Sequence, residues 1–229
     1  NLLEVKGEAP DYKITVDQVK EIVPKVKVLF LDNPKMHMPT HFTHEEIRHI
    51  VDFCKTQGVV VFLDEVYAGW EYESYLTNLN KHENLIIASG FSKLGFPCIK
   101  TGWLVTNSAL KKRLESTRLS YELDFFSCKA LECLIQNTKY INFLKNKILN
   151  TKKRWREKFS ANKSFKVYDS KGFVLRLYCE DRDLVSDVYN KLFSRKIVTS
   201  LTDNNNLLLS VTSDNRVENI VFEEMGVNK

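Results

Sequence analysis

The sequence predicts an α/β protein in which helices cover a mainly parallel sheet, followed by a smaller α+β domain at the C-terminus. Two observations predict the first part. Short, continuously apolar segments recur through residues 26–105, and amphipathic segments with helical spacing separate them. Such a succession is typical of a parallel sheet with both faces covered. The second part is predicted by short strand-like segments that gather after residue 160 around one amphipathic segment.

Two helices of the first part carry their own start signals. Thr15 with Gln18, and Thr43 with Glu46, have the three-residue spacing of a capping box. Each pair precedes apolar residues at helical spacing, so both positions are predicted helix starts. The apolar segments predicted as strands of this part are 26–31, 59–63, 85–88 and 102–105.

The character of the chain changes after residue 107. A helix is predicted over 108–121, and a long amphipathic helix over 125–159. The predicted organisation is therefore a large domain that includes residues 1–124, a connecting helix at 125–159 and a small domain at 160–229. In the small domain, strands are predicted at 165–168, 173–178 and 207–211, with a helix at 184–193.

Composition excludes several classes of protein. The 229 residues are 43% hydrophobic and 28% charged, which is the balance of a folded chain with a sizeable core. No apolar run reaches the roughly 18 residues that a membrane span needs, and the start lacks a signal-peptide profile, so we expect a cytoplasmic protein. A net charge of +5, spread along the chain, does not indicate nucleic-acid binding. Five cysteines without a CxxC pair argue against disulfides and structural zinc.

Three side chains with distinct chemistry follow the predicted strands. Asp64 and Tyr67 come directly after the second strand, and Lys93 follows the third. Ligands bind at the carboxyl ends of strands in open α/β sheets, so these positions are candidates for one site. Each residue alone also has a plain structural interpretation, as a helix cap, a half-buried aromatic residue and a surface lysine.

The combination resembles the cofactor site of a known enzyme family. Asp64-Glu65-Val66-Tyr67 is followed, 29 residues after Asp64, by Lys93 in the segment GFSKLGFPCIKTGW. This pattern resembles that of the class I/II, fold-type I aminotransferases that depend on pyridoxal phosphate, a group that includes the histidinol-phosphate and valine-pyruvate aminotransferases. The resemblance runs from about residue 10 to the C-terminus and corresponds to the later part of a family member.

The resemblance implies a role for each residue. Lys93 would form the Schiff base with pyridoxal 5'-phosphate and move a proton at the substrate Cα, both tasks for an amine. Asp64 would pair with the pyridinium nitrogen, which keeps the ring protonated. Tyr67 would donate to the phenolate oxygen of the cofactor. Ser92 would bind the phosphate, with Lys100 in place of the family's phosphate-clamping arginine.

Four positions depart from the family pattern. Met38 stands where an asparagine holds the cofactor, and Gly90 replaces a serine or threonine. Lys100 keeps the charge of the arginine it replaces but not its forked geometry. Leu208 stands where an arginine grips the substrate carboxylate. Arg176 or Arg216 is a nearby candidate to take over that task.

Two further groups of residues have open interpretations. Three histidines within eight residues match no zinc spacing, so we expect solvent or cofactor-rim positions and no metal. Three aromatic residues beyond Tyr67 are candidates either to line a substrate pocket or to pack between domains. The two groups are His37, His41 and His44, and Trp70, Tyr72 and Tyr75.

The favoured function is transamination between a small amino donor and a 2-oxo acid, without nucleic-acid or membrane partners. One alternative is another reaction of the same cofactor at Cα, such as decarboxylation or elimination. A second is a relative that keeps the fold as a binding or scaffold subunit. A third is that these residues are one part of a longer or split protein. The resemblance also implies a homodimer.

Overall fold

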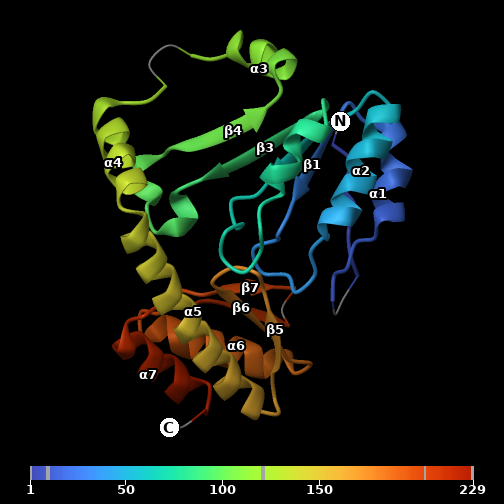
Figure 1. The fold of residues 1–229 in the computed structure, drawn as a ribbon. Helices are drawn as coiled ribbons and strands as arrows, with labels where there is room; N and C mark the ends of the chain where they lie inside the picture. The colour runs from blue at the N-terminus through green and yellow to red at the C-terminus, as the bar shows by residue number, and fades with distance from the viewer. Residues whose placement is uncertain (1, 9–10, 120–121, 204, 228–229) are drawn as a thin grey trace. The chain divides into compact units, whose positions relative to one another are not determined.

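The computed structural model describes residues 2–8, 11–119, 122–203 and 205–227, and the chain divides into two compact units (Figure 1). The large unit comprises Asn1–Lys35 and Thr40–Ile141, and the small unit comprises Met36–Pro39 and Asn142–Lys229. The short segment Met36–Pro39 therefore belongs with the C-terminal part of the chain. The domain limits predicted from the sequence stay a prediction, and the division between the units falls inside the predicted connecting segment.

The sheet of the large unit has the strand order β1-β2-β3-β4. Strands β1, β2 and β3 are parallel, which confirms the mainly parallel sheet, whereas β4 runs antiparallel to β3. The apolar composition of a strand does not reveal its direction, so the sequence could not show this reversal. The strands are β1 (Val28–Asp32), β2 (Val60–Asp64), β3 (Leu85–Gly90) and β4 (Gly102–Thr106).

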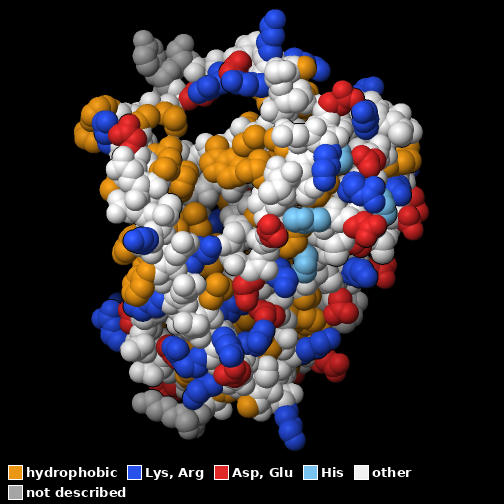
Figure 2. Space-filling view, in the orientation of Figure 1, with side chains coloured by type: hydrophobic (Ala, Val, Ile, Leu, Met, Phe, Trp, Pro, Cys, Tyr) orange, Lys and Arg blue, Asp and Glu red, His pale blue; other side chains and the backbone are white. Residues whose placement is uncertain are grey.

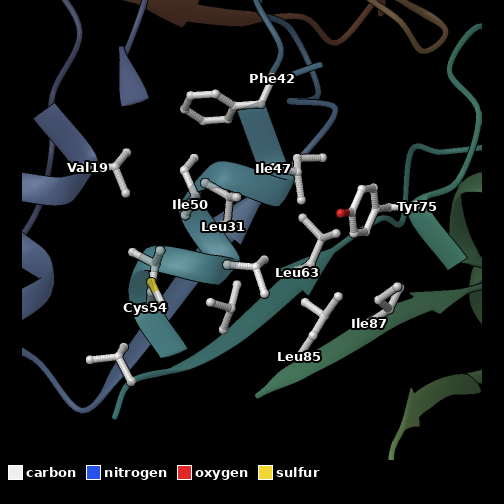
Figure 3. Close-up of a cluster of buried hydrophobic side chains, with 14 of the residues drawn as sticks. Val19, Leu31, Phe42, Ile47, Ile50, Cys54, Leu63, Tyr75, Leu85 and Ile87 are labelled. Atoms are coloured by element: carbon white, nitrogen blue, oxygen red, sulfur yellow. The ribbon is translucent and has the colours of Figure 1, made fainter. Parts of the chain in front are cut away.

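One face of this sheet packs against helices α1 (Val16–Ile22) and α2 (His44–Thr56). Both helices begin with the predicted capping boxes, in which the side chains of Thr15 and Thr43 accept hydrogen bonds from the third residue of the helix. Side chains of the helices and strands point toward one another in the core (Figure 3). The labelled core residues are Val19, Leu31, Phe42, Ile47, Ile50, Cys54, Leu63, Tyr75, Leu85 and Ile87.

The opposite face of the sheet, which we call the open face, retains much exposed apolar surface. Because side chains alternate along a strand, the residues between the core positions lie on this face. Phe30 is 72% exposed and Leu104 is 50% exposed. Hydrophobic side chains gather over β3 and β4 in the space-filling view (Figure 2). The open face is formed by Val28, Phe30, Asp32, Val60, Phe62, Asp64, Ile86, Ala88 and Leu104.

Helices follow β4, and two of them differ from the prediction. Helix α3 (Ser108–Glu115) is shorter than predicted, and residues 120 and 121 of that prediction lie outside the described residues. The prediction of a single long helix over 125–159 was wrong, because the chain forms two helices there, α4 (Phe125–Gln136) and α5 (Thr138–Ala161). Asn137 causes the break, because its side-chain amide donates to the carbonyl of Cys133 and its backbone leaves the helical region.

The small unit contains an antiparallel sheet with the order β5-β6-β8-β7. Trp155 and Phe159 of α5 and Phe222 of α7 pack edge to face in its core. Three strands and one helix match predicted segments, while β7 and α7 were not predicted. The elements are β5 (Lys166–Asp169), β6 (Val174–Tyr178), α6 (Arg182–Ser194), β7 (Ser200–Thr202), β8 (Asn206–Ser210) and α7 (Asn215–Glu224).

Candidate functional site

Strands β1 and β2 end level with each other and place two carboxylates side by side on the open face. Asp32 and Asp64 are direct partners in the parallel register, and the neighbouring Leu31 and Leu63 point into the core. Asp64 also shapes its own turn, because its Oδ1 accepts a hydrogen bond from the backbone of Val66 at 2.9 Å. The sequence predicted Asp64 at this edge but missed Asp32, which ends the preceding strand.

The two acids influence each other's proton binding. Asp32 stands on the open face, yet partial desolvation raises its pKa to about 6, with the negative charge of Asp64 adding to the increase and Lys35 opposing it. Desolvation in turn lowers the pKa of Lys35. Near neutral pH, the edge therefore holds a carboxylate pair in which Asp32 takes up a proton more readily than an ordinary aspartate.

Tyr67 lies beside this pair and is 4% exposed. Burial raises the pKa of Tyr67 to about 12, and the charges of Asp32 and Asp64 add to this effect. The phenol therefore keeps its proton at neutral pH and acts as a hydrogen-bond donor.

Lys93 reaches the same place from β3. It lies in a single 3-10 turn, η3 (Ser92–Leu94), which follows the strand almost directly and ends at Gly95 in the left-handed region. Its Nζ lies 5.5 Å from the centroid of the Tyr67 ring. The structure thus brings together an amine and a phenol that are 26 residues apart in the sequence, and the phenol in turn lies beside the two strand-end acids.

The two remaining predicted site residues lie in the segment after β3. Ser92 begins η3 and is half-buried beside Lys93. Lys100 follows a second 3-10 turn, η4 (Pro97–Ile99), where it has a φ of 47° and is exposed. A residue other than glycine rarely adopts this left-handed backbone, so the end of the turn is held in a sparsely populated conformation.

Asn33 is a supporting residue that the sequence analysis missed. It is fully buried, and its Nδ2 donates to the carbonyl of Phe42 at 3.1 Å and to the hydroxyl of Tyr72 at 2.9 Å. Its Oδ1 accepts from the backbone of Phe42 at 2.7 Å. One amide thus ties together the two ends of the loop that follows β1. Its position just after a predicted strand and before a proline was the available signal.

Glu65 is a second supporting residue that was missed. It is fully buried, accepts a hydrogen bond from the backbone of Tyr75 at 2.7 Å and accepts another from the hydroxyl of Ser74. Burial raises the pKa of Glu65, while these two hydrogen bonds act in the opposite direction. The carboxylate anchors the far end of the loop that begins with Tyr67. Strand alternation was the available signal, since it places Glu65 on the face opposite to Asp64.

Tyr72, Tyr75 and His44 of the predicted aromatic and histidine groups take part in packing within the large unit, whereas His37 belongs to the small unit. The hydroxyl of Tyr72 donates to the carbonyl of Phe42 at 2.9 Å, and the Tyr75 ring stacks on His82. His44 Nε2 lies 3.0 Å from the carbonyl of Glu73. Within the described residues, no three histidine, cysteine or acidic side chains are grouped so as to hold a metal ion.

The departures from the family pattern at Met38 and Leu208 fall in the small unit, next to Arg176. Leu208 of β8 is the direct partner of Arg176 on β6. The Nη1 atom of Arg176 lies 3.1 Å from the sulfur of Met38. Arg216, the other candidate, is exposed and pairs with Asp214. The structure therefore singles out Arg176 as the arginine nearest to the missing one.

Comparison with known proteins gives a family and a fold. The model of the family "Aminotransferase class I and II" matches residues 3–214. A histidinol-phosphate aminotransferase of Clostridium kluyveri is 28% identical over 214 residues, which cover 91% of this chain and 59% of that protein. The chain thus spans about three fifths of the length of this curated relative. None of the helices in the described residues is long and apolar enough to cross a membrane.

Two solved structures show the same fold. The histidinol-phosphate aminotransferase of Sinorhizobium meliloti, in complex with pyridoxal-5'-phosphate, superposes with a TM-score of 0.81 at 16% identity, covering 99% of this chain and 65% of that one. A decarboxylase of Sulfurospirillum multivorans superposes with a TM-score of 0.79 at 16% identity, covering 96% and 67%. Proteins with different reactions thus share this fold, so the fold alone does not select the reaction.

Proposed function

Because the chain belongs to the class I and II aminotransferase family, we propose that the protein transfers an amino group from a small amino donor to a 2-oxo acid, with Lys93 as the residue that binds pyridoxal 5'-phosphate covalently. The observation that carries this proposal is the position of the Lys93 amine, 5.5 Å from the centre of the ring of Tyr67, which itself lies beside the strand-end acids.

The donor set of the large unit fits this cofactor. Covalent binding of an aldehyde needs an amine, and Lys93 supplies it. A pyridine nitrogen that must stay protonated needs a carboxylate, and Asp64 supplies it at the end of β2. A phenolate oxygen needs a donor that keeps its proton, and the raised pKa of Tyr67 satisfies that condition.

When bound, the cofactor supplies a ring that accepts electrons from the substrate Cα. Every other task falls to side chains of the protein. Lys93 would hold the cofactor and carry a proton to and from Cα. Asp64 would hold the proton on the ring nitrogen, and Tyr67 would donate a hydrogen bond to the phenolate oxygen. Ser92 and Lys100 would bind the phosphate, Lys100 as a point charge in place of a forked arginine.

The test is to trap the cofactor on its lysine. The purified chain is incubated with increasing pyridoxal phosphate, reduced with borohydride, digested and analysed by mass spectrometry. We expect saturable labelling at Lys93, which is absent from the Lys93→Arg variant and unchanged in the control Lys111→Arg. Labelling that rises without saturation and spreads over exposed lysines would contradict the assignment.

The extent of the chain sets a second arm of this experiment. The chain spans 59% of its curated relative. We propose that the complete phosphate site also needs residues equivalent to those in the remaining part of that relative. Labelling of Lys93 that appears only after a polypeptide equivalent to that part is added would support the proposal of a split or longer protein. Failure of labelling under both conditions would favour a binding or scaffold subunit.

Transamination is distinguished from other reactions of the cofactor by its products. With a labelled amino donor and 2-oxoglutarate, transamination yields a labelled oxo acid and glutamate. Decarboxylation releases carbon dioxide, and elimination releases the substituent at Cβ. The predicted homodimer is checked in the same preparation by light scattering after size-exclusion chromatography.

A further inference from the structure

The small unit contains a group of polar side chains that the proposed cofactor site does not use. Arg176 lies in the middle of β6 and is 1% exposed. Its neighbours Leu175 and Leu177 point into the core, so its side chain lies on the opposite face of the sheet. A guanidinium is costly to bury, and a residue that serves only packing at this position would be apolar.

The side chains of Asn206 and Tyr168, which together with Arg176 we call the cradle, hold the guanidinium in place. Its Nε donates to Oδ1 of Asn206 at 2.6 Å, and its guanidinium carbon lies 5.3 Å from the centroid of the Tyr168 ring. Tyr168 and Leu208 are its direct partners on the two neighbouring strands. The guanidinium is thus fixed in orientation by one amide and one aromatic face.

Two polar atoms of this cradle point to a ligand. Asn206 is fully buried and Tyr168 is 5% exposed. Within the part of the chain that the structure describes, the Asn206 Nδ2 and the Tyr168 hydroxyl are buried without a hydrogen-bond partner. Buried donors are rarely left unsatisfied, because removing them from water without a replacement hydrogen bond destabilises the fold.

Met38 occupies the position next to the Nη1 of Arg176. Its sulfur lies 3.1 Å from that nitrogen, and a thioether is only a weak acceptor. An oxygen anion that displaced the sulfur would form a charge-assisted hydrogen bond in its place. Met38 and Leu208, two of the positions that depart from the family pattern, therefore both lie next to Arg176.

We propose that Arg176, Asn206 and Tyr168 form an oxyanion-binding site of the small unit, for an anion of the carboxylate or phosphate class. Arg176 supplies the positive charge, and the Asn206 amide and the Tyr168 hydroxyl supply further hydrogen-bond donors. The guanidinium lies on the strand next to β8, at the position directly opposite Leu208.

The test is a titration of the cofactor-free chain followed by nitrogen-15 NMR of the arginine Nε and asparagine amide signals. Sodium propionate and inorganic phosphate are added separately, with sodium chloride at matched ionic strength as the control for general salt effects. We expect saturable shifts of Arg176 and Asn206 with one of the two anions. Response to propionate identifies the site as one for carboxylates, and response to phosphate as one for phosphate groups. Absence of saturation with both anions overturns the proposal.

Variants separate binding from packing. Arg176→Met keeps an unbranched, flexible stem but removes the guanidinium, and we expect it to raise the half-saturating anion concentration at least about tenfold, since a charge-assisted hydrogen bond is lost. Arg216→Met, at an exposed arginine, is the matched control and should bind as the unmodified chain does. If Arg176→Met fails to fold, Tyr168→Phe removes a single hydroxyl and should still weaken binding measurably. Equal affinity in Tyr168→Phe and the unmodified chain would contradict the assigned cradle.

The outcome is independent of the cofactor. Lys93→Ala should keep the anion-dependent shifts, because Lys93 lies in the other unit. Anion binding without labelling of Lys93, both with and without the added polypeptide, would overturn the proposed function and leave the oxyanion site in place.

Discussion

The two sheets of the chain distribute their polar residues differently. On the open face of the large unit, apolar side chains fill the strands until Asp32 and Asp64 at their last positions. In the small unit, polar side chains stand in mid-strand, where Arg176 is bounded on both sides by core leucines. A parallel sheet presents chemistry at its carboxyl edge, whereas an antiparallel sheet with one apolar face has the whole of its second face available for it.

The largest predicted effect tests whether each sheet depends on its own core. Trp155→Ala removes a ring that is 1% exposed, and we expect it to lower the free energy of unfolding of the small unit by about 3–5 kcal/mol. Ile47→Ala in the large unit is the counterpart, with an expected loss of about 2–5 kcal/mol. Hydrogen exchange measured by mass spectrometry, peptide by peptide, should show faster exchange in the mutated unit. Equal acceleration in both units would show that they unfold together.

The next effect concerns the buried carboxylate beneath the acid edge. Glu65→Ala leaves the Tyr75 amide without its acceptor, so we expect a loss of about 1–3 kcal/mol in the free energy of unfolding. Chemical denaturation followed by circular dichroism measures the loss. Glu73→Ala, at an exposed glutamate eight residues later, is the control and should remain within about 0.5 kcal/mol. A loss of the same size in both variants would mean that the hydrogen bond to Tyr75 is not the cause.

A smaller effect depends on pH and tests the carboxylate pair. The pKa of Asp32 in the folded chain, about 6, lies above its ordinary value of 3.8, so the folded state binds this proton more tightly than the unfolded state does. The resulting stabilisation is present below pH 3.8 and is lost as the pH rises through 6. Because the side chain is exposed, the loss is on the order of 1 kcal/mol or less.

Asp32→Asn removes this dependence. Relative to the unmodified chain, the variant should be more stable above pH 6 and no more stable below pH 4. Urea denaturation at a series of pH values measures the difference. A constant difference at all pH values would show that Asp32 does not titrate as described, and Asp11→Asn, at an exposed aspartate, is the control.

The smallest effect on stability is predicted at the open face. Phe30 is 72% exposed and contacts Phe62 at 5.1 Å between ring centroids. Phe30→Ser should change the free energy of unfolding, measured by urea denaturation, by no more than about 0.5 kcal/mol. Phe193→Ser, at a phenylalanine of the small unit that is 60% exposed, is the matched control. A loss clearly larger than that of Phe193→Ser would show that Phe30 contributes to stability through its contact with Phe62.

Elements with local signals were the ones that the sequence predicted well. The capping boxes at Thr15 and Thr43 mark the helix starts within one residue, because the cap is a contact between residues three apart. The short strand β7 and the break at Asn137 were missed. Strand β7 forms only because it pairs with β8, which lies later in the chain. The helix ends at Asn137 because its side chain donates to the carbonyl of Cys133, a contact that the composition of the segment does not reveal.

The candidate site was predictable to the same extent. Asp64, Tyr67 and Lys93 were found because strand ends converge in any parallel sheet, so a position in the sequence implies a position in space. Asp32 was missed because its role depends on the register of β1 against β2, which the sequence does not specify. The partners of Arg176 come from three separated segments, and only the folded small unit shows them together.

Asp64 and Glu65 are adjacent acids with opposite duties, one on the open face and one in the interior. The insertion or deletion of a single codon within Val60–Leu63 would exchange them. The acid bound to Ser74 and Tyr75 would then face the open side, and the other would enter the core without its partners. Substitutions can accumulate in this strand while its apolar alternation is kept, but its length cannot change by one residue. Among homologous sequences, this segment should therefore tolerate substitutions but show no insertions or deletions before the acid pair.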